Sequence, residues 1–247
     1  TGALEIKGDA ATVAELITIN AATSGAFKLG GNTIAAIYTD TAANLISAFT
    51  GITSHRGGLT ISDTGPVSAS ELNIITTFQA AGVTTVTATS EITGSAADIV
   101  IAIGTTNPDA NVAIAITGTD AATIDELMAI NVLTGGDIFL NPQTISANLG
   151  GKAANLTAAF EGINTSTGDL TITGTTAASI AELIKINDAT SGNVVLNAAT
   201  IAKAYDDTAA NLAAAFDGIT TSTGALEIKG DAATVAELIT INAATSG

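Results

Sequence analysis

The chain has no cysteine and no tryptophan, and it has only three prolines among 247 residues. Without cysteine there are no disulfide bridges, thiolate metal sites or cysteine nucleophiles. Aromatic residues make up 3% of the sequence, so the core must be aliphatic. No apolar run approaches the roughly 18 residues of a membrane-spanning helix, and we expect no membrane insertion.

Basic residues are also scarce. Seven Lys and Arg stand against 23 Asp and Glu, which gives a net charge of −16. Nucleic-acid binding depends on clustered Lys and Arg that neutralise phosphates, so we expect no nucleic-acid partner. The same deficit disfavours anionic membrane surfaces. An acidic surface keeps a protein soluble and attracts cations loosely.

Internal repetition, by contrast, is abundant. Residues 1–25 and residues 223–247 have the same sequence, TGALEIKGDAATVAELITINAATSG. Strand-like words such as LEI and LTI end at Ile6, Ile61, Ile116, Ile172 and Ile228, which gives a period of about 55 residues. A fixed period of this kind is typical of repeat architectures. We expect one continuous repeat segment over 1–247, with units at 1–56, 57–111, 112–167 and 168–223 and a partial fifth at 224–247.

Each unit divides into two strand–helix halves. In the fourth unit, the first half opens with LTIT at 170–173, which alternates apolar and polar residues as a half-buried strand does. The helix expected next has a stripe at the spacing i, i+3, i+4, i+7, formed by Ile180, Leu183, Ile184 and Asn187. The stripe therefore ends in a polar residue.

The second half begins with strand-like NVVLN at 193–197 and continues through an expected linker at 198–207. A helix should follow at 208–219. Its apolar face and those of its counterparts comprise Leu212, Ala215, Phe216 and Ile219; Leu45, Phe49 and Ile52; and Leu156, Phe160 and Ile163. Gly51, Gly162 and Gly218 stand near the ends of these helices, where C-cap glycines belong.

Capping signals mark where the helices begin. A Ser or Thr followed three residues later by Glu forms a capping box. Five units have it at the same place: Thr12/Glu15, Ser68/Glu71, Thr123/Glu126, Ser179/Glu182 and Thr234/Glu237. The second halves have a weaker variant, Thr41/Asn44, Ser95/Asp98 and Thr208/Asn211, and Lys152 breaks it in the remaining unit.

These signals predict an α/β fold. Strands joined through a returning helix run parallel. We therefore expect a repeat solenoid of short parallel strands alternating with amphipathic helices, in which each unit of about 55 residues holds two strand–helix halves. A two-sheet β-solenoid is the alternative. The stretch 62–106 is the least regular, and we interpret it as a diverged unit.

Nothing in the sequence indicates catalysis, and we expect no enzyme. The chain has one histidine, His55, and no second His or Cys with which to build a metal site. Without partners nearby in the sequence, His55 is expected at the surface. No nucleophile elbow, phosphate loop or zinc-protease motif occurs, so no catalytic or cofactor-binding residue is assigned.

The carboxylates have two interpretations. The five recurring glutamates are explained by the capping boxes. Asp40, Asp206 and Asp207 gather at junctions between loop and helix, where they could cap helices or contribute oxygen ligands to calcium. We favour capping because the sequence has no calcium-binding repeat motif. These three residues remain the weak calcium candidates.

The phrases ITGTDAATIDELMAI at 116–130 and ITGTTAASIAELIKI at 172–186 resemble repeats of very large secreted bacterial surface proteins, of the surface-layer, fibre and adhesin types. The resemblance covers the whole chain and rests on the rhythm of hydrophobic-Thr-Gly-Thr-x-Ala-Ala. It implies an extracellular or cell-surface location and a structural or adhesive role. We also expect the chain to be one length of a longer array.

Two functions follow from these features of the sequence. The first is a structural segment of an extracellular filament, stalk or surface coat, which associates with further copies of the repeat or with neighbouring chains. The second is an adhesin module that binds a glycan or a cell surface. Aromatic side chains are few for the second role, since the chain has two Tyr and six Phe.

Overall fold

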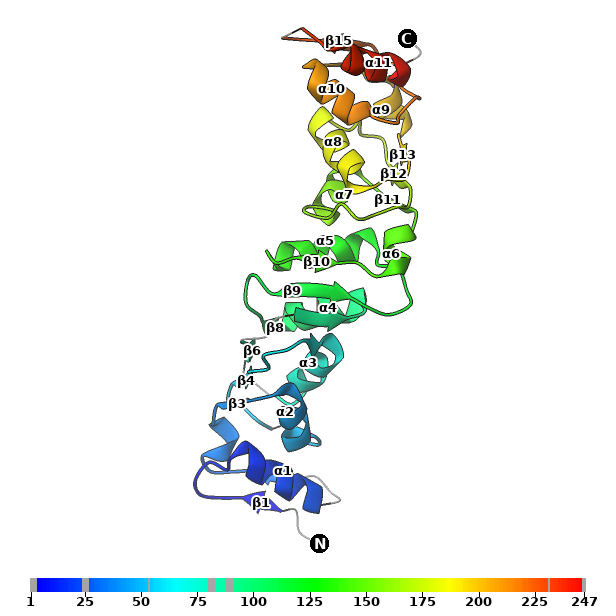
Figure 1. The fold of residues 1–247 in the computed structure, drawn as a ribbon. Helices are drawn as coiled ribbons and strands as arrows, with labels where there is room; N and C mark the ends of the chain where they lie inside the picture. Colours follow the sequence, from blue (N-terminus) through cyan, green and yellow to red (C-terminus); the bar gives the residue numbers. More distant parts are fainter. Residues whose placement is uncertain are drawn as a thin grey trace. The chain divides into compact units, whose positions relative to one another are not determined.

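The structure, a computed structural model, describes residues 4–23, 27–52, 54–79, 83–87, 91–230 and 232–245. Over these residues it is α/β, with eleven helices and many short strands in several small sheets and no closed barrel (Figure 1). Every strand pairing in the described residues is parallel. The predicted α/β class and the parallel strands are confirmed.

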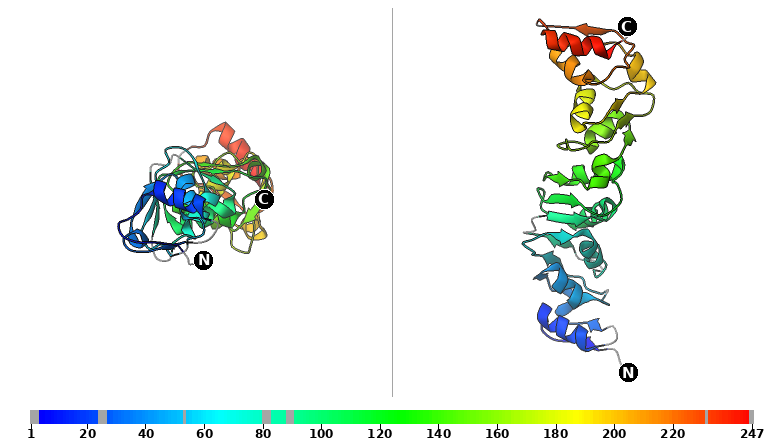
Figure 2. Two further views of the ribbon diagram at one scale, coloured as in Figure 1. Left: turned by 90° about the horizontal axis from the view of Figure 1, so that it is seen from below. Right: turned by 45° about the vertical axis from the view of Figure 1, so that its right-hand side comes forward.

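The chain forms two compact units: the first comprises Thr1–Gly118 and Leu133–Phe139, and the second comprises Thr119–Val132 and Leu140–Gly247. In the first unit, consecutive helices pack against each other and begin at nearly equal intervals along the chain (Figures 1 and 2). They are α1 (Val13–Ala22), α2 (Ala42–Phe49), α3 (Ala69–Thr76) and α4 (Ala96–Thr105).

The second unit repeats this succession. Its main helices are α5 (Ile124–Leu133), α7 (Ala153–Ala159), α8 (Ile180–Ala189), α10 (Ala209–Phe216) and α11 (Val235–Ala244). α7 packs against α8, α8 against α10, and α10 against α11. In Figure 2 the last three follow one another from yellow through orange to red. None of the described helices has the length and hydropathy needed to cross a membrane.

In the first unit, two four-stranded sheets interleave along the chain. One comprises β3 (Tyr38–Asp40), β4 (Leu59–Ile61), β6 (Thr84–Val86) and β8 (Thr106–Asn107); the other comprises β5 (Val67–Ser68), β7 (Glu91–Gly94), β9 (Ala113–Ile116) and β10 (Ile138–Phe139). A separate pair joins β1 (Glu5–Ile6) to β2 (Lys28–Leu29). From β4 to β9 the chain contributes strands to the two sheets alternately, and a helix follows each strand of the second sheet from β5 to β9.

In the second unit the sheets are shorter. One contains β11 (Leu149–Gly151), β12 (Leu170–Ile172) and β13 (Val194–Val195), and the other contains β14 (Tyr205–Asp207) and β15 (Leu226–Ile228). The prediction of a linker at 198–207 was wrong, because α9 (Ala198–Ala202) and β14 occupy it. The related short helices are α6 (Pro142–Ser146) and the 3-10 turn η1 (Thr33–Ala35). Helices this short cannot show a helical period in the sequence.

The apolar faces of the second-half helices are confirmed. Leu45, Phe49, Leu212 and Phe216 are fully buried. In the first-half helix α8, the prediction was wrong at one position. Ile184 is only partly buried, whereas Ile180, Leu183, Ile186 and Ala189 form the buried stripe. Because α7 and α10 both pack against α8, its buried face follows a three-residue spacing.

Glycine permits close backbone contact between successive segments. A Cβ atom built on Gly168 would lie 1.9 Å from the carbonyl oxygen of Ala147, and one on Gly224 would lie 2.0 Å from that of Lys203. A Cβ atom on Gly57 would lie 1.9 Å from the carbonyl oxygen of Ala36 in the same way. No other residue fits at these positions without moving the backbone.

The predicted helix caps are present. In all five capping boxes the hydroxyl of Ser or Thr accepts the N–H of the Glu three residues on, and the Glu carboxylate accepts the N–H of the cap residue. Thr41, Ser95 and Thr208 cap α2, α4 and α10. Lys152 begins α7 without a side-chain cap, as predicted.

The missing cap on α7 generates a first prediction. Lys152→Thr should supply the hydroxyl that Thr208 supplies to α10 and raise the free energy of unfolding by about 1 kcal/mol. The measurement is urea unfolding together with hydrogen exchange of the Asn155 amide, which the new hydroxyl should protect. Thr208→Lys is the matched control and should destabilise α10 by a similar amount. No change in either variant would contradict the assignment.

Candidate functional site

The most regular feature of the chain is a contact between two kinds of helix. We call α1, α3, α5, α8 and α11 the box helices, because each begins with a capping box. We call α2, α7 and α10 the AANL helices, after their shared first residues. Each AANL helix follows a box helix, in the pairs α1–α2, α5–α7 and α8–α10.

The polar part of this contact begins with an asparagine, the eighth residue of the box helix. In the second unit, Asn187 Nδ2 lies 3.0 Å from the carbonyl oxygen of Ala214 and 3.1 Å from that of Asp217. Asn20 donates to the same two positions, Ser47 and Thr50, at 2.8 and 3.2 Å. Asn131 donates to Glu161, the counterpart of Asp217, at 2.9 Å, but its other acceptor, Ala159 at 3.3 Å, lies one residue later than in the other two pairs. The last carbonyls of a helix have no partner within it, and these amides satisfy them.

A second polar contact lies near the other end of the box helix. The fully buried hydroxyl of Thr200, in α9, accepts the N–H of Ala178 at 3.0 Å, one residue before the cap Ser179. Thr33 and Thr144, also fully buried, accept the N–H groups of Ala11 and Ala122 at 3.1 and 2.8 Å. The Asn197 side chain caps α9 by accepting the N–H of Thr200 and donates to carbonyls of residues 174 and 176.

An aromatic pair supports two of the three contacts. Tyr205 meets Phe216 edge-on with ring centroids 5.5 Å apart, and its hydroxyl donates to the Ala178 carbonyl at 2.8 Å. In the first unit, Tyr38 meets Phe49 in the same geometry at 5.3 Å. The apolar interior and the polar contacts on both sides together fix the register between consecutive helices.

The prediction that His55 lies at the surface was wrong. The residue is fully buried, between the rings of Tyr38 and Phe49 at centroid distances of 5.4 and 4.9 Å. Its Nε2 lies 2.9 Å from the Ala36 carbonyl oxygen, so this nitrogen carries the proton. These two rings come from the preceding strand β3 and helix α2, and only the folding of those elements brings them against His55.

Burial lowers the pKa of His55, and the bond to Ala36, which opposes this shift, does not outweigh it. Nδ1 has no hydrogen-bond partner among the residues that the structure describes. A charged imidazole here would therefore have to lose water without a carboxylate to compensate it. His55 is a neutral core residue and offers no catalytic geometry.

The calcium candidates do not converge. Asp40 Oδ1 accepts the Thr41 N–H at 2.8 Å and the Asn44 amide at 2.7 Å. Asp207 makes the same two bonds to Thr208 and Asn211, and both lower its pKa, the Asn211 bond more. Asp206 precedes it in β14, so the two side chains point to opposite faces of the strand.

No group of three or more His, Asp or Glu side chains capable of holding a metal occurs in the described part of the chain. Asp40 and Asp207 accept the N–H of the cap residue that follows each of them, whereas the caps of α2 and α10 are Thr41 and Thr208. The capping glutamates are affected similarly. Hydrogen bonds from the backbone N–H and then the hydroxyl of Thr12 lower the pKa of Glu15, and those of Thr234 do so for Glu237.

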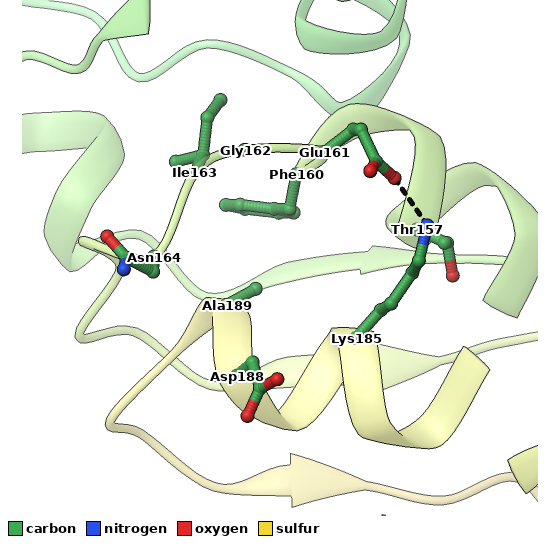
Figure 3. Close-up of a pocket in the computed structure, with 9 residues that line it drawn as sticks. All are labelled: Thr157, Phe160, Glu161, Gly162, Ile163, Asn164, Lys185, Asp188 and Ala189. Atoms are coloured by element: carbon green, nitrogen blue, oxygen red, sulfur yellow. Dashed lines mark hydrogen bonds and ion pairs between the residues drawn. The ribbon is translucent and has the colours of Figure 1, made fainter. Parts of the chain in front are cut away.

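A pocket of about 240 Å³ lies beside the end of α7, lined by Phe160, Ile163 and Ala189 among others (Figure 3). Lys185 Nζ reaches the Glu161 carboxylate across it at 2.6 Å. Both side chains are more than half exposed, and an ion pair of this kind contributes about 0–1 kcal/mol. The residues that line the pocket include no histidine.

Comparisons with protein-family models, curated proteins and solved structures found no match to this chain. The site must therefore be interpreted from its own geometry. That geometry places repeated donors and acceptors between successive helices, whereas no reactive group is assembled in the described residues.

Sequence reasoning identified some residues of this contact and missed others. Asn187 stood out as the polar end of an apolar stripe, yet nothing in the sequence showed which carbonyls it meets. The buried threonines were missed because threonine is frequent throughout the chain. One signal was available in the sequence: Thr144 and Thr200 are separated by one repeat period, the same spacing that separates the strand-like segments ending at Ile116 and Ile172.

The asparagine contact generates a second prediction. Asn187→Ala removes two hydrogen bonds and should lower the free energy of unfolding by about 1–2 kcal/mol. Hydrogen exchange of the last turn of α10, where the carbonyls lose their partner, should accelerate. Asn242→Ala is the matched control, because Asn242 holds the same place in α11 and has no hydrogen-bond partner in the described residues. Equal losses in the two variants would contradict the assignment.

His55 generates a third prediction. Because its pKa is lowered in the folded chain, its stabilising contribution is complete above about pH 6.5 and is lost as the pH falls below that value, where the unfolded chain gains the proton first. The loss should reach at most about 1.4 kcal/mol per pH unit.

Hydrogen exchange of α2 between pH 5 and 7, corrected for the intrinsic rate, measures this loss. His55→Gln retains a neutral donor and should flatten the pH dependence, even if it lowers stability at pH 7. A pH dependence that persists unchanged in this variant would show that another group causes it.

Proposed function

We propose that this chain is a structural segment of an extracellular filament, stalk or surface coat. It consists of strand–helix segments that stack one on the next, and its role is mechanical, so the proposal needs no catalytic site or cofactor. The single observation that carries the proposal is the recurrence of one contact, in which the asparagine of a box helix donates to the carbonyl 30 residues further on, in the pairs α1–α2, α5–α7 and α8–α10.

Such a contact supports extension because it is directional. The box helix donates from its eighth residue, and the AANL helix accepts at its carboxyl end. A contact between two different surfaces does not close on itself, and it generates an open assembly when repeated with a constant step. Each segment then buries its faces against its two neighbours only, as in solenoid proteins.

The proposed architecture is an α/β solenoid with a unit of about 55 residues. Two observations support it: the buried threonines Thr144 and Thr200 recur at the period of the strand words, and the helices begin at nearly equal intervals within each compact unit. The acidic, cysteine-free composition and the resemblance to secreted surface proteins support a location outside the cell.

The adhesin alternative finds less support. A glycan-binding face would be expected to present aromatic rings, but seven of the eight Phe and Tyr side chains are buried: Phe27, Tyr38, Phe49, Phe78, Phe160, Tyr205 and Phe216. Phe139 is the exception, with 53% of its surface exposed. One ring offers no clustered platform, and we therefore place the structural role first.

A fourth prediction tests this role. Chains of one, two and three copies of residues 1–222 should grow in one dimension only, by the same increment for each copy. Eight strand–helix segments at a strand spacing of about 4.8 Å set a minimum increment of about 38 Å. Small-angle scattering and electron microscopy give the maximum dimension and the cross-section. Growth of the cross-section with copy number would contradict the proposal.

A further inference from the structure

One sheet of the first unit has an outward face that the structural role does not use. In Figure 1, β3, β4 and β6 follow one another along the side of this unit away from α2 and α3. Their inward side chains belong to the core, since Tyr38, Leu59, Ile61 and Val86 are buried. Successive residues of a strand point to opposite faces, so the residues between these face solvent.

The outward residues of these strands form two rows of hydroxyl groups. The strand register aligns Thr39 with Thr60 and Thr60 with Thr85, which gives the first row. The register continues one pair past the strand ends, through backbone hydrogen bonds of 3.1 and 2.8 Å donated by the N–H groups of Ser62 and Thr87. We call the two rows together the hydroxyl face: Thr39, Thr60 and Thr85, and Thr41, Ser62 and Thr87.

The first row has the more available hydroxyls. Thr39 is exposed, Thr60 and Thr85 are partly exposed, and their hydroxyls make no hydrogen bond within the described residues. The second row is partly engaged inside the protein. Thr41 caps α2, and the Thr87 hydroxyl donates to a main-chain carbonyl at 3.1 Å.

Apolar groups border the first row, and charge is absent. Ile37 and Val83 are 75% and 63% exposed, and each lies two residues before a threonine of this row. Gly58 lies between them in the register, and the side chain of Ile37 is 3.8 Å from the position that a Cβ atom would take there. Over 37–41, 58–62 and 83–87, every outward side chain is uncharged, in a chain with a net charge of −16.

The sheets of the second unit do not have this combination. At the positions equivalent to Thr39 and Thr60, strands β14 and β15 carry Asp206 and Glu227. In β12, Thr171 occupies the equivalent row, but its register partners are a glycine and a valine. The uncharged rows of hydroxyls are therefore a property of β3, β4 and β6 and not of the repeat in general.

The geometry of the hydroxyl face favours an ordered solid as its partner. Adjacent strands lie about 4.8 Å apart, and residues i and i+2 on one face lie about 6.7 Å apart. Threonine is restricted at χ1, so its methyl and hydroxyl groups keep nearly fixed positions on this grid. Water molecules in ice repeat at similar spacings in two directions, whereas a flexible glycan or peptide has no such two-dimensional repeat.

We propose that the hydroxyl face binds the surface of ice. A threonine hydroxyl donates one hydrogen bond and accepts two, so it substitutes for a water molecule of the lattice. The methyl groups beside it, with Ile37 and Val83, are apolar and leave the neighbouring water to bond within the lattice. A charged side chain would instead orient water around itself. This activity goes beyond the structural role and does not depend on stacking between copies.

The experiment uses the complete chain and substitutions that the repeat already contains. Thr39→Asp with Thr60→Glu gives β3 and β4 the residues that β14 and β15 have at these positions, so this face variant should retain the fold. Thr171→Glu with Thr173→Asp is the matched control, because it adds the same charge to the outward side of β12. Circular dichroism and urea unfolding check that each chain is folded.

Each chain is then exposed to a slowly growing ice front, and its concentration in the ice is compared with that in the remaining liquid. We expect the unsubstituted chain and the matched control to be enriched in the ice to the same extent. The face variant should be enriched at least about tenfold less, because a charge that loses water without gaining a partner strongly disfavours binding.

Exclusion of the unsubstituted chain from the ice would overturn the proposal, and so would equal enrichment of all three chains. Two further results would assign the hydroxyl face to another partner if ice enrichment is absent. One is binding to insoluble cellulose or chitin that only the face variant loses, and the other is a dimer that only this variant abolishes. None of these outcomes affects the growth of tandem copies, which tests the structural role separately.

Discussion

The contact between a box helix and the AANL helix after it is the constraint on which the rest of this structure depends. Helices of eight to ten residues are marginal in water and gain their stability from packing. Each helix here has a narrow aliphatic face and few aromatic rings to bury. Amide and hydroxyl contacts on both sides of that face set the register, so that small side chains can meet at van der Waals distance without large ones to guide them.

The use of small side chains in these contacts is consistent with the low content of aromatic residues in the sequence. Alanines such as Ala48 and Ala215 and threonines such as Thr144 and Thr200 are fully buried in the core, at positions where larger side chains are common in other proteins. Charged side chains either face solvent, as Lys185 and Glu161 do, or accept hydrogen bonds at helix starts, as Glu15 and Glu182 do. Even the carboxylates that looked most like metal ligands, Asp40 and Asp207, are occupied at helix starts. The chain therefore assigns most of its distinctive residues to architecture.

Much of this could be predicted from the sequence, for physical reasons. Capping boxes act over three residues, and a helix stripe acts over seven, so both are visible in a short window. The short helices α6 and α9 were not, because their signal is one asparagine cap and one buried threonine. His55 was placed wrongly because its burial depends on Tyr38 and Phe49, which reach it only after folding. The acceptors of Asn187 were hidden for the same reason, since they lie 27 and 30 residues away.

The glycines at the crossing points have a consequence for how such a sequence can drift. Between copies, alanine, serine and threonine replace one another on the surface with little effect on the backbone. At Gly168 or Gly224 a single added methyl group would collide with the carbonyl of the preceding segment. The collision would lie between two segments rather than inside a helix. A point mutation there would therefore change the distance between neighbouring segments while leaving the helices on either side intact.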